Sequence, residues 1–244
     1  MKDYLLEIVK HTHGLGVIEL AKVTGTSKET VITAIAEDRT VIVDATTAVP
    51  VAEFLGVFGM PNLGKLNTII NIPEYRDGAK LSITTKTNNA NVVVPDGIHF
   101  ENKSGDFKND YRFMAAEIVN DKIKTAKFKG VKWGVEVEPS VLSIQRLKFQ
   151  SQANSEETTF IAKTNNGDLV FYFGDHSSHA GNFVFATGIT GSLSRAWSWP
   201  VSVVNSILSL PGDKTLRFSD EGAAQITVDS GLAVWNYTLP AITK

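Results

Sequence analysis

The sequence predicts an α+β protein built from two similar domains, each a doubled unit of one short helix and several antiparallel strands. Three observations support this. Runs with alternating apolar and polar residues, typical of half-buried strands, fill most of the 244 residues. Helix-like segments interrupt them at four places, and several segments recur in the same order with residue numbers 134 to 141 apart. Two domains of roughly 120 residues each are large enough to bury a core without disulfides.

The repeat consists of four pairs of similar segments, each weak alone but all in the same order. The pairs are residues 5–8 with 141–144, 20–22 with 161–163, 66–70 with 204–208, and 78–83 with 212–218. This spacing exceeds the roughly 20–50 residues of a solenoid repeat, so it indicates a duplicated and fused domain. We expect an N-terminal domain over residues 1–118, a connector over 119–130 and a C-terminal domain over 131–244.

The first half begins with an amphipathic helix over residues 3–12, whose apolar side carries positions 5, 6, 8 and 9. After Gly14 and Gly16 the apolar period changes from helical spacing to two. We expect Pro61 to open a second helix, which extends to residue 71. Proline is favoured in the first turn of a helix, because the N–H that it lacks would have no partner there. The predicted strands are 17–24, 29–36, 40–45, 53–60, 81–86, 92–94, 97–101 and 110–114.

The second half repeats this plan. Pro139 opens a helix to residue 153 and Pro200 a helix to residue 209. Asn166-Gly167 is a hairpin signal, since both residues tolerate positive φ. Trp197 and Trp199 alternate along a strand, which favours packing in a core or interface over ligand stacking. The predicted strands are 131–138, 158–163, 168–174, 182–187, 215–219, 223–229 and 233–239.

Composition excludes several functional classes. The chain has no cysteine, which rules out disulfides and thiolate metal sites. Its 24 basic and 26 acidic residues leave a formal net charge of −2, so any binding to nucleic acid requires cations gathered on one surface. It contains neither an apolar run long enough to cross a membrane nor a signal peptide at its N-terminus, so we expect an intracellular, cytoplasmic protein.

Two motifs suggest catalysis, and we discount both. Residues 59–65 match the G-x-x-x-x-G-K pattern of a phosphate-binding loop, but Leu66 stands where Ser or Thr binds Mg²⁺ and Pro61 removes a backbone donor. The segment from Asp175 to His179 offers His176 and His179 as metal ligands, but no further ligand or second shell is evident. We interpret it as a polar loop.

The two-domain pattern resembles the DNA sliding clamps, the family of the phage clamps and proliferating cell nuclear antigen (PCNA). Residues 232–241 resemble the last strand of clamps, with an aromatic residue, a leucine and a proline before a short tail. The helix after Trp199-Pro200 and the segment 212–219 are similar to a clamp's final helix and the strand after it. Residues 107–114 resemble the clamps of T4-like phages more than those of cells.

This resemblance implies a ring of six domains, made by a homotrimer, that encircles duplex DNA without reading its sequence. It implies a non-enzymatic processivity factor in phage DNA replication, in the host cell's cytoplasm, with no cofactor, metal or catalytic residue. Its partners are a DNA polymerase and a clamp-loader ATPase. The short helices line the hole, and the side chains expected to face DNA are Lys2, Lys10, Lys65, Arg146, Lys148 and Gln150. The helix over 200–209 offers only Ser and Asn, a departure from a basic lining.

The resemblance also implies two protein-binding regions. Partner peptides insert apolar anchors near the connector and the last strand, where the candidates are Phe128, Tyr237, Leu239 and Pro240. Tyr237 and Leu239 have core packing as an open alternative, because the strand register is not known from sequence. Head-to-tail rings need one edge strand from each half. Our candidates there are Tyr111, Phe113, Phe183 and Phe185.

Two alternative functions remain at this point. A structural or assembly protein with two β-rich domains has the same patterning without a basic helix surface. A metal-dependent enzyme using residues 175–179 is the second alternative.

Overall fold

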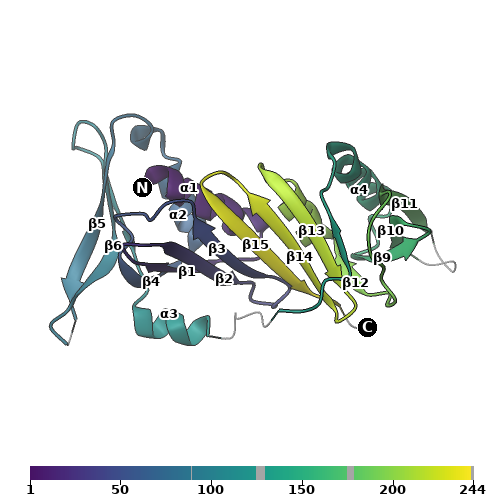
Figure 1. The fold of residues 1–244 in the computed structure, drawn as a ribbon. Helices are drawn as coiled ribbons and strands as arrows, with labels where there is room; N and C mark the ends of the chain where they lie inside the picture. The colour runs from purple at the N-terminus through teal and green to yellow at the C-terminus, as the bar shows by residue number, and fades with distance from the viewer. Residues whose placement is uncertain (89, 125–129, 175–178, 243–244) are drawn as a thin grey trace. The chain divides into compact units, whose positions relative to one another are not determined.

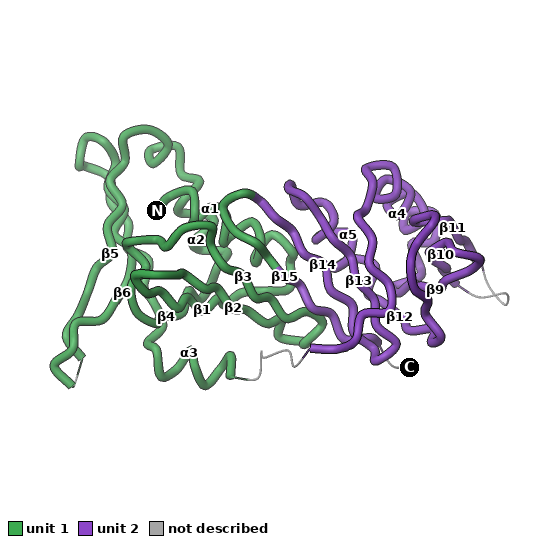
Figure 2. The backbone as a smooth tube through the Cα atoms, viewed as in Figure 1, with its two compact units in different colours: residues 1–127, 231–235 green, residues 128–230, 236–244 purple. Residues whose placement is uncertain are grey.

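The computed structural model describes residues 1–88, 90–124, 130–174 and 179–242 (Figure 1). Short helices accompany mostly antiparallel strands, which confirms the α+β class. The chain divides into two compact units (Figure 2). Unit 1 comprises residues 1–127 and 231–235, and unit 2 comprises residues 128–230 and 236–244. A short segment of the C-terminal strand therefore belongs to the unit formed by the N-terminal half.

Unit 1 begins with α1 (Lys2–His11) and the 3-10 turn η1 (His13–Leu15). Four antiparallel strands follow in the spatial order β4-β1-β2-β3. The alternating burial along β1 and β2 follows the period-two pattern of the sequence. These strands are β1 (Leu20–Gly25), β2 (Thr30–Ile35), β3 (Ile42–Thr47) and β4 (Gly56–Pro61).

The rest of unit 1 starts with α2 (Leu63–Ile70) and the 3-10 turn η2 (Pro73–Tyr75). A three-stranded meander follows, made of β5 (Lys80–Thr87), β6 (Val93–Glu101) and β7 (Lys108–Arg112). The unit then forms α3 (Ala116–Lys122), a helix that we did not predict.

Unit 2 repeats this order. The short strand β8 (Val135–Val137) precedes α4 (Val141–Ala153), and α5 (Val201–Leu208) follows β12 as α2 follows β4. Its first four-stranded sheet has the order β12-β9-β10-β11, and β13, β14 and β15 form the second meander. These strands are β9 (Thr159–Asn165), β10 (Asp168–Phe173), β11 (Gly181–Ala186), β12 (Ser198–Pro200), β13 (Asp213–Ser219), β14 (Ala223–Asp229) and β15 (Ala233–Pro240).

The internal duplication is confirmed at the level of topology. Each half has a helix, a sheet in which the fourth strand pairs with the first, a second helix and a three-stranded meander. The four recurring sequence segments fall on matching elements, namely α1 and α4, β1 and β9, α2 and α5, and β5 and β13. The repeat therefore encodes the same supersecondary unit in both halves.

Pro61 is the last residue of β4 and not the first of α2, and two further local predictions needed correction. The two strands predicted at 92–94 and 97–101 form a single strand, β6 (Val93–Glu101). Pro95 sits where the register between β5 and β6 shifts, at a bulge that tolerates its missing N–H. Gly97 is required there, because a Cβ atom would lie 2.4 Å from the Tyr111 carbonyl oxygen of β7.

Helix α3 is the other correction. Its residue Val119 is fully buried, and together with Ile123 it packs against apolar side chains of the first sheet, Leu20, Ile35, Ile42, Val57 and Met114. Glu117 in the first turn and Lys122 in the last are helix-end signals that the sequence carries.

Candidate nucleic-acid interface

Helices α1 and α2 of unit 1 pack against each other and expose two cations. In α1, Leu5, Ile8 and Val9 are buried, and α2 packs beside it. Lys10 on α1 and Lys65 on α2 are exposed. A hollow of about 390 Å³ between the two helices is lined by Leu6, Val9, Lys10, His13, Gly14 and Asn67.

Lys2 differs from the other predicted DNA-facing lysines. Its ammonium donates hydrogen bonds to the carbonyl oxygens of Tyr75 and Arg76, the latter at 3.0 Å. This lysine therefore anchors the start of α1 to the 3-10 turn η2.

The N-terminus of α2 is occupied by a carboxylate of the protein itself. The Leu63 N–H donates to the Glu19 backbone oxygen at 3.3 Å, and the Gly64 N–H donates to the Glu19 side chain at 3.4 Å. His13 holds that same carboxylate at 2.7 Å through its Nδ1 atom. The Leu63 and Gly64 N–H groups of the segment 59–65 are therefore already bound by Glu19, and β4 runs antiparallel to β1 instead of forming a βαβ unit.

The helices of unit 2 have a similar arrangement. Ser140 caps α4 by accepting a hydrogen bond from the Ser143 N–H at 3.0 Å, and α4 packs beside α5. Arg146 and Lys148 are exposed. Gln150 is half-buried and hydrogen-bonded, with its Oε1 atom 3.0 Å from the Asn154 amide nitrogen.

Charge is segregated on these four helices although the whole chain is nearly neutral. No Asp or Glu occurs in α2, α4 or α5. In α1, Asp3 is exposed but Glu7 is buried. The exposed helix surfaces thus carry Lys10, Lys65, Arg146 and Lys148 against a single exposed carboxylate. Helix α5 contributes hydroxyl and amide groups only, as the sequence indicated.

The strands predicted to join subunits lie at sheet edges. Within the described residues, β7 pairs only with β6 inside its sheet, and β11 only with β10. However, Tyr111, Phe113 and Phe185 are buried in their own units, and Phe183 is half-buried. Burial raises the pKa of the Tyr111 hydroxyl, which donates a hydrogen bond to the Pro61 carbonyl oxygen. Any pairing along these edges therefore runs mainly through backbone groups.

The predicted peptide anchors have different surroundings. Phe128 lies outside the described residues. Tyr237 and Leu239 are fully buried, which is the core packing that we kept as an alternative, whereas Pro240 is exposed. A hollow of about 390 Å³ lies elsewhere in unit 1, where α3 packs on the first sheet, and it includes Leu20, Ile35, Pro61, Met114 and Ile123. Sequence reasoning missed this hollow because it missed α3.

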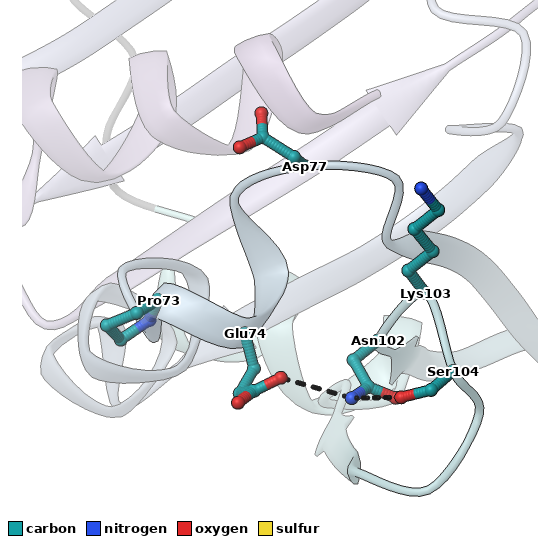
Figure 3. Close-up of a pocket in the computed structure, with 6 residues that line it drawn as sticks. All are labelled: Pro73, Glu74, Asp77, Asn102, Lys103 and Ser104. Atoms are coloured by element: carbon teal, nitrogen blue, oxygen red, sulfur yellow. Dashed lines mark hydrogen bonds between the residues drawn. The ribbon is translucent and has the colours of Figure 1, made fainter.

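Another hollow, of about 660 Å³, lies beside the loop between β6 and β7 (Figure 3). Its buried polar residue, Asn102, donates to Glu74 at 3.1 Å and accepts from three backbone N–H groups of residues 105–107. In Figure 3, Glu74 is linked through Asn102 to Ser104, while Asp77 and Lys103 make none of the drawn bonds. Asn102 therefore shapes its own loop.

Residues 175–178, which include most of the candidate metal loop, lie outside the described residues. Among the residues that are described, no group of three or more His, Asp or Glu side chains is arranged to hold a metal ion. The described part of the chain also has no helix with the length and apolarity needed to span a membrane.

Comparison with known proteins identifies the fold. The chain is similar to the PCNA of A. fulgidus in a structure with the C-terminal region of FEN-1 bound (9% identity, 100% of this chain and 97% of that chain, TM-score 0.72). It is similar to PCNA from Thermococcus kodakaraensis (14% identity, coverage 98% and 97%, TM-score 0.66) and to the PCNA2–PCNA3 complex from Sulfolobus tokodaii (12% identity, coverage 98% and 96%, TM-score 0.61). No family model and no curated protein matches the sequence. The predicted clamp fold is thereby confirmed over the whole chain.

Proposed function

We propose that this chain is a DNA sliding clamp, which encircles duplex DNA and tethers the replicative polymerase of a phage. One observation carries the proposal. The chain has a duplicated fold that is similar to PCNA over its whole length. The exposed helix cations of each unit lie on a pair of helices that pack against each other, α1 with α2 and α4 with α5. In this proposal the protein is a non-enzymatic scaffold and acts in the host cytoplasm.

The charge pattern suits this task. A ring that must slide along DNA gains processivity from its topology, so its contacts to the duplex have to be weak and independent of sequence. Lysine and arginine reaching phosphates meet that requirement, because phosphate contacts carry no sequence information and weaken with salt. We propose Lys10, Lys65, Arg146 and Lys148 as the principal phosphate contacts, with Lys2 and Gln150 contributing less because both are engaged within the chain.

Ring closure requires a heterologous interface, in which one surface of a chain meets a different surface of the next. We propose that the edges β7 and β11 pair between chains, with Tyr111, Phe113, Phe183 and Phe185 supporting them from within. With two similar domains per chain, bounded at 1–118 and 131–244 and joined by 119–130, three chains complete a ring of six domains.

Protein partners are proposed to be a polymerase and a clamp-loader ATPase that present short peptides. The similar PCNA of A. fulgidus binds the C-terminal region of FEN-1, which is a precedent for peptide capture. For this chain we propose docking around Phe128 and the exposed Pro240, with Tyr237 and Leu239 forming the buried support.

Oligomeric state is the first test of this function. Light scattering across a range of protein concentrations should detect a species of three chains that dissociates toward the 26.5 kDa monomer on dilution. A strict monomer at every concentration contradicts the ring and favours the structural-protein alternative.

DNA binding is the second test, and the duplication offers a matched control. The pair Lys65→Ala and Lys148→Ala removes one helix cation from each unit. The pair Lys22→Ala and Lys163→Ala removes equal charge from equivalent positions of β1 and β9, next to the buried Ala21 and Ala162. We expect only the helix pair to weaken duplex binding, with the slope of log K against log salt smaller by up to about two for each chain that contacts the duplex. Equal effects of the two pairs contradict the proposed interface.

A further inference from the structure

Helix α4 exposes an apolar surface that the proposed duplex contact does not require. Val141 is 74% exposed, Leu142 55% and Phe149 65%, which puts three of the protein's exposed large apolar side chains on one helix. The opposite side of α4 is anchored by the buried Ser143 and Leu147. Phe149 is therefore available to a ligand without any rearrangement of the core.

Spacing places this aromatic ring among cations. Leu142, Arg146 and Phe149 are at positions i, i+4 and i+7, so they form one exposed stripe along the helix. Lys148 is the neighbour of Phe149 and is also exposed. Neither α4 nor α5 has a carboxylate, so the charged side chains that these two helices contribute near the phenyl ring are cationic.

An exposed aromatic ring among cations is better suited to binding a polyanion with accessible flat faces than to binding an apolar partner helix. A partner helix needs a continuous apolar stripe, whereas Gln145 and Arg146 interrupt the one on α4. Duplex DNA offers phosphates, but its base faces are stacked on one another. Single-stranded DNA offers both phosphates and open base faces, which stack on aromatic side chains without regard to sequence.

We propose that the exposed face of α4 binds unpaired DNA, with Phe149 stacked on a base and Arg146 and Lys148 on the flanking phosphates. This inference rests on the proposed clamp function and extends it, because it gives the helix surface of unit 2 a specific affinity for single-stranded segments beside the duplex. Leu142 covers the sugar next to the stacked base.

The test compares two DNA probes on the full chain. One is a short oligothymidylate with a single 2-aminopurine, whose fluorescence is quenched by stacking, and the other is a duplex of the same length. Phe149→Ala should weaken single-strand binding by roughly 5- to 100-fold and abolish the protein-dependent quenching. Phe149→Tyr should retain both. Ile118→Ala is the control, since it removes an exposed apolar side chain from α3, a helix of unit 1.

Each outcome decides the proposal. If duplex binding persists and Phe149→Ala leaves single-strand binding unchanged, the stacking site is contradicted while the clamp function stands. If neither probe binds the wild-type chain, the proposed function fails and the inference fails with it. If Phe149→Ala changes the oligomeric mass in light scattering, the Phe149 side chain belongs to an interface between protein chains, and the proposed DNA site is overturned.

Discussion

The indole N–H of Trp235 donates a hydrogen bond to the Glu7 carboxylate, at a distance of 3.1 Å. The two residues are 228 positions apart, yet both belong to unit 1. His11 stacks on the same indole with ring centroids 4.6 Å apart, and its Nε2 atom lies 3.2 Å from the same Glu7 oxygen. A buried polar contact thus joins the last strand of the chain to its first helix.

Removing the acceptor of this contact should destabilise the protein. Glu7→Ala leaves the buried Trp235 N–H without this carboxylate, so we expect a loss of about 1–3 kcal/mol in the free energy of unfolding. Glu7→Gln keeps an acceptor and should lose less. Urea unfolding followed by tryptophan fluorescence measures both, and Asp3→Ala on the exposed side of α1 is the control. Equal stability of Glu7→Ala and wild type would show that the contact contributes little.

Acid should weaken the meander β5-β6-β7 through Asp96. The hydrogen bond from the Lys86 ammonium, 2.9 Å away, together with the charge of Arg112, lowers the pKa of the Asp96 carboxyl. A lowered folded-state pKa means that this stabilisation is present above the unfolded value of about 3.9 and is lost as pH falls through the folded value.

Asp96→Asn should therefore cost up to about 1 kcal/mol at neutral pH, since both partner cations are half exposed or more. The difference from wild type should narrow below about pH 4. Urea midpoints across a pH series measure this, with the exposed Asp77→Asn as control. A difference that is constant with pH would exclude the ionised carboxylate as its source.

Backbone pairing along β7 can be tested at Arg112. The Phe113 N–H donates to the backbone carbonyl oxygen of Asp96 in β6, at 2.9 Å. Successive N–H groups of a strand point to opposite sides. The Arg112 N–H thus points away from β6, on the edge of β7 that we propose for pairing between chains. Arg112→Pro and Arg112→Ala both remove the ion pair with Asp96, but only proline removes the N–H.

We expect Arg112→Pro to raise the concentration at which the assembly dissociates by roughly tenfold relative to Arg112→Ala, since one hydrogen bond is lost at each interface. Light scattering on dilution measures the midpoint. Identical midpoints for the two variants would remove β7 from the interface.

Gly59 should prove to be a packing residue. A Cβ atom there would lie 2.8 Å from the Val119 Cγ2 atom and 3.0 Å from the Met114 Cβ atom. Gly59→Ala should therefore push α3 off its sheet and lower stability by about 1–3 kcal/mol. Gly14→Ala is the control, because its nearest contact would be the Val9 oxygen at 3.7 Å. An unperturbed Gly59→Ala variant in urea unfolding would contradict tight packing of α3.

Much of the fold could be predicted because it is encoded locally. Alternating burial along β1 and β2 follows their sequence period, and Asn166 and Gly167 adopt the positive φ values of 49° and 85° that their pairing indicated. The duplication was evident because equivalent elements kept similar apolar patterns. The absence of carboxylates from α2, α4 and α5 likewise follows directly from the order of residues in the chain.

The rest depended on contacts between distant segments. The one-strand course of β6 through Pro95 and Gly97 required a bulge of β6 at its pairing with β5 and a close approach of β7. The burial of Tyr237 and Leu239 depended on strand register, which exchanges buried and exposed faces with a shift of one residue. Periodicity, the repeat and the placement of charge are local properties, so the residue order was enough to establish them. The choice of side chains that became core required the folded chain, because burial is settled by packing partners that are far away in the sequence.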